Sequence, residues 1–279
     1  MLSGKGKVAG VIGWPVSHSL SPALHNFWLN YYNIDGVYIP MPVKPEELPE
    51  VIKVLPKLGI RGFNLTLPHK ELVIPYLDFM DEDAKFIGAV NTVLIANDGT
   101  IQGMNTDAYG FIRNIQPHID GKKNKAVVLG AGGAAKAICY GLIKEGFGEI
   151  LLLNRTQEKA EEMAAHFGGR VHVKSWDTRN RALDWADLLV NATSLGMESK
   201  EPLEISLDML PKHAVVTDIV YTPLQTPLLK DAKGRGYLVV DGLGMLMHQA
   251  VPAFRVWYGI KPEILPELRP HLIKAQGVK

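Results

Sequence analysis

The sequence predicts an α/β protein of two domains, and three observations support this fold class. Short apolar runs alternate with amphipathic segments along the chain, which is the pattern of parallel strand-helix units. The alternation is regular over residues 125–240 and opens with a glycine-rich turn, whereas residues 1–105 are richer in proline and polar loop motifs. The length of 279 residues allows two domains of ordinary size, each with its own hydrophobic core.

The composition limits the class of partner and compartment. The chain has 30 basic and 29 acidic side chains, so it lacks the excess positive charge that nucleic acids and acidic membranes attract. Its single cysteine, Cys139, cannot form an intramolecular disulfide, which favours a reducing compartment. No apolar run reaches the ~18 residues of a membrane span. We therefore expect a cytoplasmic protein that binds neither nucleic acid nor membrane.

The expected elements follow one another in the order of an α/β chain. Strand-like runs cover residues 8–12, 37–40, 62–67, 125–129, 150–153, 188–191, 215–220 and 237–240, and helical patterns cover 23–30, 108–115, 136–145, 157–166, 245–258 and 263–275. Residues 93–95 and 100–103 flank an Asn-Asp-Gly turn, which predicts an antiparallel hairpin.

The last two helical patterns come after the regular alternation, and we expect them to pack on the first domain. The predicted first domain is therefore discontinuous, with residues 1–106 and 242–279, and the second domain covers residues 107–241. The active site is expected in the cleft between the domains, where ligand sites are common.

The glycine-rich turn predicts a dinucleotide-binding site. A strand-like run ends at residue 129, the turn reads G-A-G-G-A-A, and a helix follows. The first glycine permits a tight turn, the second lets the backbone approach a pyrophosphate, and the helix N-terminus offers N–H donors, as in a Rossmann-type domain. The alternative is a turn that merely connects two elements. The candidate binding residues are Gly130, Ala131, Gly132, Gly133 and Ala134.

The end of the next strand indicates which dinucleotide binds. An NAD site usually has an acidic residue there for the ribose 2′-hydroxyl, but this chain has Asn154, Arg155 and Thr156. An arginine and a hydroxyl suit a 2′-phosphate, so the predicted cofactor is NADP. The alternatives are a solvated surface arginine and, for Thr156, a helix N-cap.

Two serines precede the first helical pattern. Ser21 stands where an N-cap is expected, followed by Pro22, so capping alone explains this serine. Together with Ser19 it also forms a neutral, donor-rich cup for a carboxylate at the helix N-terminus.

Several polar residues of the first domain carry further candidate chemistry. Asn64 and Thr66 alternate along a strand, hence lie on one face, and the chain then turns and presents Lys70. The plain alternative is a solvated outer face with an exposed lysine. Candidate partners for Lys70 come from two later motifs that contain Asn91 and Asp107, although Asp107 also suits a helix cap.

In their order and approximate spacing, these motifs resemble the shikimate dehydrogenase family. Besides the glycine-rich turn, the resemblance rests on residues 18–22 (HSLSP), 64–71 (NLTLPHKE), 88–92 (GAVNT), 105–107 (NTD), 154–156 (NRT), 191–197 (NATSLGM), 218–223 (DIVYTP) and 242–250 (GLGMLMHQA). It covers most of the chain. This chain has Leu65 where the family often has another aliphatic residue, and His248 where it often has a small residue.

The resemblance implies a role for each motif. It implies that Lys70 and Asp107 form the catalytic pair and that NADP binds the glycine-rich turn and residues 154–156, with Ile219 and Gly242 near the nicotinamide. It further implies that the substrate is bound by Ser19, Ser21, Asn64, Thr66, Asn91, Tyr221 and Gln249.

The implied reaction is the reversible reduction of 3-dehydroshikimate to shikimate by NADPH, in the biosynthesis of chorismate and the aromatic amino acids. A lysine ammonium suits this reaction, because it can bond the carbonyl oxygen, stabilise the developing alkoxide and donate the proton. No metal is expected, because the nine histidines show no paired ligand spacing and a second cysteine is lacking. We expect a small-molecule substrate and a monomer or homodimer.

Two other functions remain open at this stage. A relative that also oxidises quinate, or that prefers NAD, would share the motifs, although Arg155 argues against NAD. A nucleotide sensor without turnover would share the fold. The presence of both Lys70 and Asp107 argues against a sensor, which needs no proton donor.

Overall fold

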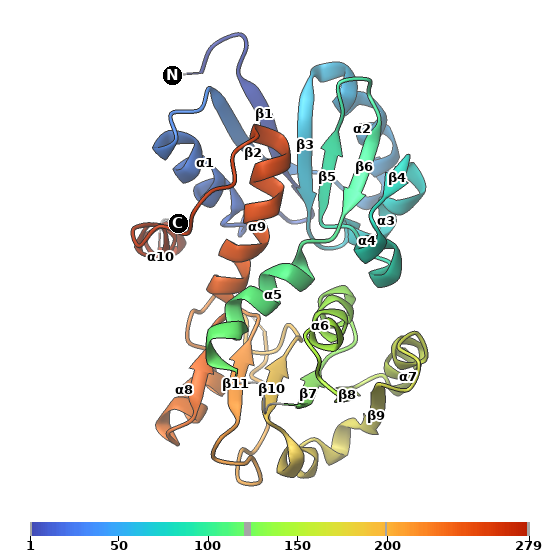
Figure 1. Ribbon diagram of the computed structural model, residues 1–279, viewed down its shortest axis with the longest axis vertical. Helices are drawn as coiled ribbons and strands as arrows, with labels where there is room; N and C mark the ends of the chain where they lie inside the picture. The colour runs from blue at the N-terminus through green and yellow to red at the C-terminus, as the bar shows by residue number, and fades with distance from the viewer. Residues whose placement is uncertain (1, 120–123, 199, 278–279) are drawn as a thin grey trace. The chain divides into compact units, whose positions relative to one another are not determined.

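The chain folds into two compact units (Figure 1). The computed structural model describes residues 2–119, 124–198 and 200–277. One unit comprises Met1–Thr106 with Gln249–Lys279, and the other comprises Asp107–His248. The sequence places the return to the first unit at residue 242, whereas the compact unit resumes at Gln249, inside helix α9 (Gly242–Tyr258). The binding roles of the two parts stay predictions.

The first unit contains a mixed sheet with the strand order β2-β1-β3-β5-β6-β4. Strands β1, β2 and β3 are parallel, whereas β5 runs antiparallel to both β3 and β6 and so forms the predicted hairpin. The bounds are β1 (Lys7–Gly13), β2 (Gly36–Pro42), β3 (Ile60–Leu65), β4 (Phe79–Met80), β5 (Thr92–Ile95) and β6 (Ile101–Met104). The helices are α1 (Ser21–Tyr31), α2 (Leu48–Val54), α3 (His69–Leu72), α4 (Glu82–Ile87), α10 (Leu268–Gln276) and the part of α9 from Gln249.

The two faces of this sheet have different cores. One face is aliphatic, with Ile12, Phe63 and Val93 packed in a cluster that includes Leu48 and Ile52 of α2. The opposite face carries an aromatic block from α1, β2 and α9, in which the rings stack or meet edge to face. Its members are His25, Trp28, Tyr38, Phe254, Trp257 and Tyr258.

Gly62 permits the close contact between this block and the sheet. A Cβ on Gly62 would overlap both the indole nitrogen of Trp257 and the carbonyl oxygen of Val93. The same indole N–H donates to Val93 O at 2.8 Å. The absence of a side chain at position 62 therefore lets α9 anchor on β3 and β5 through a satisfied hydrogen bond.

The second unit contains a parallel sheet with the strand order β12-β11-β10-β7-β8-β9. Figure 1 shows β7, β10 and β11 side by side in this unit. The bounds are β7 (Lys125–Leu129), β8 (Glu149–Asn154), β9 (Val171–Ser175), β10 (Leu188–Asn191), β11 (Val215–Asp218) and β12 (Leu238–Val240). The helices are α5 (Asp107–Ile115), α6 (Gly133–Lys144), α7 (Gln157–Ala165), α8 (Pro227–Gly234) and the first part of α9.

Both faces of the parallel sheet are covered, which explains its uninterrupted apolar strands. Ala126 and Val128 of β7 lie in a cluster with residues of α5, α6 and α7, whereas Val127 and Leu129 lie in another cluster with residues of α8. Since successive side chains of a strand point to opposite faces, a strand buried on both sides is apolar throughout. This is the doubly wound arrangement that the strand-helix alternation predicts.

Some predicted elements differ from the observed ones. The strand expected over residues 62–67 ends at Leu65, because a turn follows in which His69 N donates to Thr66 O. The helix expected from residue 263 begins only at Leu268, since Pro266 disfavours helical backbone at the residue before it. The edge strand β9 and the two-residue β4 were not predicted, because both are too short or too polar to stand out as apolar runs.

No helix in the described part of the chain is both long and apolar enough to cross a membrane.

We predict that Gly62→Ala destabilises the first unit by about 1–3 kcal/mol, because the added methyl group must displace Trp257 or the backbone of Val93. The measurement is urea unfolding followed by tryptophan fluorescence. Gly4→Ala in the same unit is the control, because a Cβ there meets no atom within 4 Å. Equal stability of both variants would contradict the proposed tight packing at Gly62.

Candidate active site

The glycine-rich turn has the geometry of a phosphate-binding loop. Gly130 follows β7 with a φ of 104°, and a Cβ there would lie 3.0 Å from Thr193 Cγ2. Gly132 is the N-cap of α6, and a Cβ at this position would meet no atom within 4 Å. The turn is therefore closed on the side of the loop after β10 and open at the helix N-terminus, where N–H groups lack partners within the helix.

Residues 154–156 form a tight turn at the end of β8. Asn154 Nδ2 donates to Thr156 O at 2.7 Å, and the side chains of Arg155 and Thr156 are exposed. Thr156 stands at the N-cap position of α7 as predicted, but its hydroxyl makes no capping hydrogen bond within the described chain. A guanidinium and a hydroxyl therefore face solvent at the strand end where the sequence predicts a 2′-phosphate site.

The loops after β10 and β11 are cross-linked by a buried carboxylate. Asp218 accepts hydrogen bonds from Thr226 Oγ1 at 2.7 Å, Asn191 Nδ2 at 3.0 Å and Val220 N at 3.0 Å. Asn191 in turn accepts from Thr193 Oγ1 at 2.7 Å. Burial outweighs these bonds and raises the pKa of Asp218 to about 6. The network fixes both loops beside the glycine-rich turn.

Gly242 and Ile219, both predicted near the nicotinamide, are brought together. Gly242 is the first residue of α9, and a Cβ there would overlap the carbonyl oxygen of Ile219. Only a glycine allows this approach without a shift. Tyr221 follows two residues later in the same loop, and burial raises the pKa of its phenol.

The two serines lie at the start of α1 in the first unit. The prediction that Ser21 is an N-cap is wrong: the N-cap is Leu20, and Ser21 and Pro22 are the first two helical residues. A serine before a proline fits the N-cap and the first helical position equally well in sequence. Ser21 N donates to Ser19 Oγ at 3.3 Å, so the two serines are adjacent, and capping does not use the hydroxyl of Ser21.

The centre of the first unit's polar site is Asn91, a residue that is 3% exposed. Its carbonyl oxygen accepts from Asn64 Nδ2 at 3.0 Å and from Leu65 N at 2.9 Å, which joins it to β3. Its side-chain oxygen accepts from Thr106 N at 2.8 Å and from Thr92 Oγ1 at 3.1 Å. Three segments far apart in the sequence therefore meet at one residue.

Gln249 of α9 joins the same network. Its Oε1 accepts from Asn91 Nδ2 and Thr106 Oγ1, both at 3.4 Å. Gln249 and Asn64 are both buried in the intact chain, so this cluster is a packed polar site and not the solvated strand face of the alternative interpretation. The structure thus brings together Asn64, Asn91 and Gln249, three of the residues predicted to bind substrate.

Two contacts place Lys70 beside the Asn91 cluster: one involves its own backbone, and the other involves the preceding residue, His69. Lys70 O accepts from Val90 N at 2.8 Å, which sets α3 next to the segment that carries Asn91. The buried His69 ring donates through Nε2 to Val43 O at 2.8 Å and so anchors the start of α3. The Lys70 side chain is half-buried, and Thr66, just past β3, is also half-buried.

Asp107, the predicted partner of Lys70, is buried and is the first residue of α5 in the second unit. It follows Thr106 directly, whose N–H is bound by Asn91. The chain therefore passes from the Asn91 network to this carboxylate in one residue. The pairing of Lys70 with Asp107 stays a prediction.

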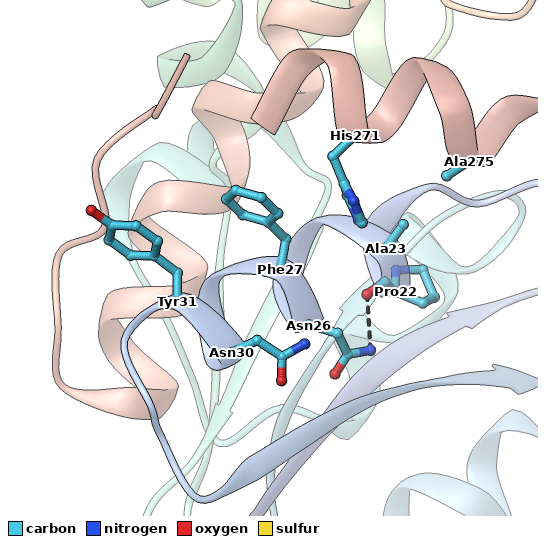
Figure 2. Close-up of a pocket in the computed structure, with 8 residues that line it drawn as sticks. All are labelled: Pro22, Ala23, Asn26, Phe27, Asn30, Tyr31, His271 and Ala275. Atoms are coloured by element: carbon cyan, nitrogen blue, oxygen red, sulfur yellow. Dashed lines mark hydrogen bonds between the residues drawn. The ribbon is translucent and has the colours of Figure 1, made fainter. Parts of the chain in front are cut away.

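A groove of about 660 Å³ lies elsewhere in the first unit, between α1 and α10. Figure 2 shows Phe27 of α1 and His271 of α10 facing each other across it, with ring centroids 5.1 Å apart. Tyr31, which also lines it, is largely exposed. None of the predicted substrate-binding residues lines this groove, and we assign it no ligand.

Sequence reasoning missed several members of the two networks, Thr193 and Thr226 among them. For Thr92 and Thr106, the only hint in the sequence is a hydroxyl side chain next to a predicted site residue. Asp218 and Asn191 ended apolar strands within the family motifs without an assigned role. A polar residue at the carboxyl end of a buried parallel strand is the signal that would have found the last two.

Comparison with known proteins assigns the family. Residues 11–93 match the model of the "Shikimate dehydrogenase substrate binding domain", and residues 113–222 match "Shikimate / quinate 5-dehydrogenase". A shikimate dehydrogenase (NADP(+)) of Paramagnetospirillum magneticum is 49% identical over 98% of this chain and 100% of the relative. The chain belongs to the shikimate dehydrogenase family. The resemblance inferred from the motifs is thereby confirmed.

Solved structures of the family confirm the predicted fold class. A shikimate dehydrogenase in complex with NADP+ is 40% identical over 99% of this chain and 97% of its own, with a TM-score of 0.91. The Thermus thermophilus enzyme in complex with NADP(H) and shikimate is 37% identical over 96% of this chain and 99% of its own, with a TM-score of 0.87.

The same fold also occurs with another substrate and cofactor. A quinate dehydrogenase of Corynebacterium glutamicum in complex with NAD is 30% identical over 96% of this chain and 99% of its own, with a TM-score of 0.89. Specificity within the shikimate dehydrogenase family therefore depends on site residues and not on the fold.

We predict that Asp218 lowers the stability of the ligand-free chain as pH rises. Its raised pKa means that the folded state holds the proton more tightly than the unfolded state, so the unfolding free energy falls between about pH 4 and pH 6. Asp218→Asn lacks this titration. The difference in unfolding free energy between the natural chain and this variant should therefore fall by about 2 kcal/mol between pH 4 and pH 7.

The measurement is urea unfolding of both proteins at several pH values. Asp184→Asn, at an exposed position of the same unit, is the control and should parallel the natural chain. A difference in unfolding free energy between the natural chain and Asp218→Asn that does not change with pH would contradict the raised pKa of Asp218.

Proposed function

We propose that this chain catalyses the reversible reduction of 3-dehydroshikimate to shikimate with NADPH and that Lys70 is its proton donor. The oxidoreductase reaction and the NADP cofactor follow from family membership, since curated relatives at 45–51% identity are NADP(+)-dependent shikimate dehydrogenases. The reaction belongs to the biosynthesis of chorismate and the aromatic amino acids. The observation that carries the residue assignment is the buried network around Asn91, beside the backbone of Lys70.

The second unit fits the cofactor. The open N-terminus of α6 and the residues of the glycine-rich turn would hold the pyrophosphate, with Gly130 allowing the turn and Gly132 the close approach. Arg155 and Thr156 would bind the 2′-phosphate, and the neighbouring Ile219 and Gly242 would lie near the nicotinamide. When bound, the nicotinamide donates or accepts the hydride.

Lys70 would supply the proton that the carbonyl oxygen needs. Hydride addition to a carbonyl carbon places negative charge on the oxygen, and an ammonium group in contact with that oxygen stabilises the charge and donates its proton. In the reverse direction the neutral amine accepts the proton from the substrate hydroxyl. Asp107 would hold the ammonium in place and bond the adjacent hydroxyl.

The remaining polar residues would position the substrate. Ser19 and Ser21, adjacent at the N-terminus of α1, suit the carboxylate because the helix end favours negative charge. The ring hydroxyls would be bound by Asn64, Thr66, Asn91, Tyr221 and Gln249. Buried hydrogen-bonding groups of this kind reject a ligand that leaves them unpaired.

The alternatives are weaker on the same residues. NAD would leave Arg155 without an anionic partner, and a nucleotide sensor would need neither Lys70 nor the buried polar site of the first unit. Oxidation of quinate as a second substrate is the alternative that turnover must decide. We further propose a cytoplasmic protein, monomeric or homodimeric, whose partners are its small-molecule ligands and not nucleic acid or membrane.

We predict that Lys70→Met lowers kcat for shikimate oxidation by about 100-fold or more, because the proton donor and acceptor is lost while the side-chain volume is kept. NADP binding should be unchanged. The measurement is NADPH formation at 340 nm under saturating substrate, with thermal unfolding as a folding check. Lys53→Met, on an exposed position of α2, is the control and should keep full activity. Activity of Lys70→Met equal to this control would exclude the proposed role.

We predict that Arg155→Ala raises KM for NADP by about 10- to 100-fold, because a charge-assisted contact to the 2′-phosphate is lost. KM for NAD should not change. The ratio of kcat/KM with NADP to kcat/KM with NAD should therefore fall by the same factor. Lys230→Ala, at an exposed position of the same unit, is the control. Equal changes with both cofactors would show that Arg155 does not contact the 2′-phosphate.

A further inference from the structure

Both amide hydrogens of Asn64 are used within the protein. Asn64 Nδ2 donates to Asn91 O and to Thr92 Oγ1, each at 3.0 Å. A backbone carbonyl can only accept, so the contact with Asn91 O fixes which end of the amide is the nitrogen. Asn64 therefore has no N–H left for a ligand in this arrangement.

The other end of the Asn64 amide receives a hydrogen bond from a buried phenol. Tyr38 Oη donates to Asn64 Oδ1 at 2.6 Å, and Tyr38 is 1% exposed. Burial raises the pKa of Tyr38 well above its ordinary value of 10, so the hydroxyl keeps its proton and remains a donor. An amide oxygen has two lone pairs, and Tyr38 uses one of them. Toward a ligand, Asn64 can therefore act only as a hydrogen-bond acceptor, through the second lone pair.

The backbone of Tyr38 is held by a side chain of α1. Asn26 Oδ1 accepts from Tyr38 N at 3.0 Å, and Asn26 Nδ2 donates to Tyr38 O at 2.8 Å. Asn26 thus satisfies the free edge of β2 as a neighbouring strand would.

The ring of Tyr38 is held by stacking. It lies parallel to the ring of His25, with centroids 4.2 Å apart, and Trp257 packs at 5.8 Å. Burial lowers the pKa of His25 to about 3, an effect that the neighbouring Asn64 side chain offsets only in part, so His25 stacks as a neutral ring. Among the residues that the structure describes, neither of its nitrogens has a hydrogen-bond partner.

The sheet register leaves room for the Tyr38 side chain to reach Asn64. Tyr38 pairs with Ala9 of β1, and Ala9 pairs with Gly62 of β3, so these positions lie on one face. Asn64 lies two residues beyond Gly62 on the same face. Small residues at positions 9 and 62 therefore separate the phenol from the amide that it contacts.

We propose that Tyr38 is a positioning residue for the substrate site, which holds Asn64 as a pure hydrogen-bond acceptor toward one non-reacting ring hydroxyl of shikimate. This proposal rests on the proposed function, in which Asn64 binds a ring hydroxyl. Its chemical consequence is that the ring position facing Asn64 must carry a group with a proton to donate. A fluorine, an ether or a carbonyl there places lone pairs against the Asn64 oxygen and is rejected.

The first test uses the natural enzyme with shikimate analogues in which one of the two non-reacting ring hydroxyls is replaced by hydrogen or by fluorine. Fluorine accepts weakly but cannot donate. At the hydroxyl bound by Asn64, we expect kcat/KM to fall about 10-fold or more for either replacement, with fluorine at least as poor as hydrogen. If fluorine restored activity relative to hydrogen at both ring positions, the acceptor-only role of Asn64 would be refuted.

The second test asks whether Tyr38 acts through that hydroxyl. For Tyr38→Phe we expect the ratio of kcat/KM for shikimate to that for the matching deoxy analogue to shrink about 5- to 10-fold, because Asn64 is no longer held in place. KM for NADP should not change. Tyr258→Phe is the matched control, since the Tyr258 hydroxyl also donates within the aromatic block, to Val37 O at 3.2 Å, away from Asn64.

The outcomes separate this proposal from the proposed function. A uniform loss on both substrates in Tyr38→Phe, or a shrunken ratio in Tyr258→Phe as well, would make Tyr38 merely structural. Retained discrimination in Asn64→Ala would show that Asn64 does not bind that hydroxyl, and the assignment of this residue would fail. Absence of shikimate turnover in the natural enzyme would overturn the proposed function itself.

Discussion

The polar site of the first unit depends on the requirement that the buried polar groups of Asn91, its side-chain amide and its backbone carbonyl, all be hydrogen-bonded. An unpaired polar group in such a place costs about 1–3 kcal/mol, so its partners are fixed as strictly as core side chains. Those partners come from β3, β5, the segment before α5 and helix α9, and one of them, Gln249, lies more than 150 residues away in sequence. Val90, which precedes Asn91 in the chain, also fixes the backbone of Lys70, because Val90 N donates to Lys70 O. Folding of the unit and assembly of a candidate substrate site are therefore one event.

The second unit combines close backbone approach with a buried polar network. Gly130 and Gly242 stand where a side chain would crowd or overlap the loops after β10 and β11, and Asp218 ties those two loops together. Glycine at these positions allows the close backbone approach, and the N-terminus of α6 is open at Gly132, which suits a phosphate-bearing cofactor. The two units thus differ in how their candidate sites are built: the first gathers buried side-chain amides, and the second brings backbone segments close together.

Much of this was accessible from sequence because its signals are local. The apolar runs predicted most strands of both sheets, the Asn-Asp-Gly turn predicted the hairpin, and the order and spacing of the motifs predicted the family. The helix position of Ser21 was not accessible, because a serine before a proline fits two adjacent positions. The function inferred for Tyr38 was not accessible either, since an aromatic residue in an apolar strand is indistinguishable from a core residue until its hydroxyl is seen to reach Asn64. The protonation of Asp218 depends on burial, which only the folded chain defines.

The most direct measurement is a neutron diffraction structure of the chain with shikimate and NADP bound, because it locates the protons on which the account depends. We expect the hydrogen bonds of Asn91 to persist, and both Asn64 amide protons to remain directed at Asn91 O and Thr92 Oγ1. We also expect a substrate hydroxyl to donate to Asn64 Oδ1, and Lys70 Nζ to lie within hydrogen-bond distance of the oxygen on the reacting carbon. A substrate bound away from Lys70, or an Asn91 network that breaks when the substrate binds, would contradict it.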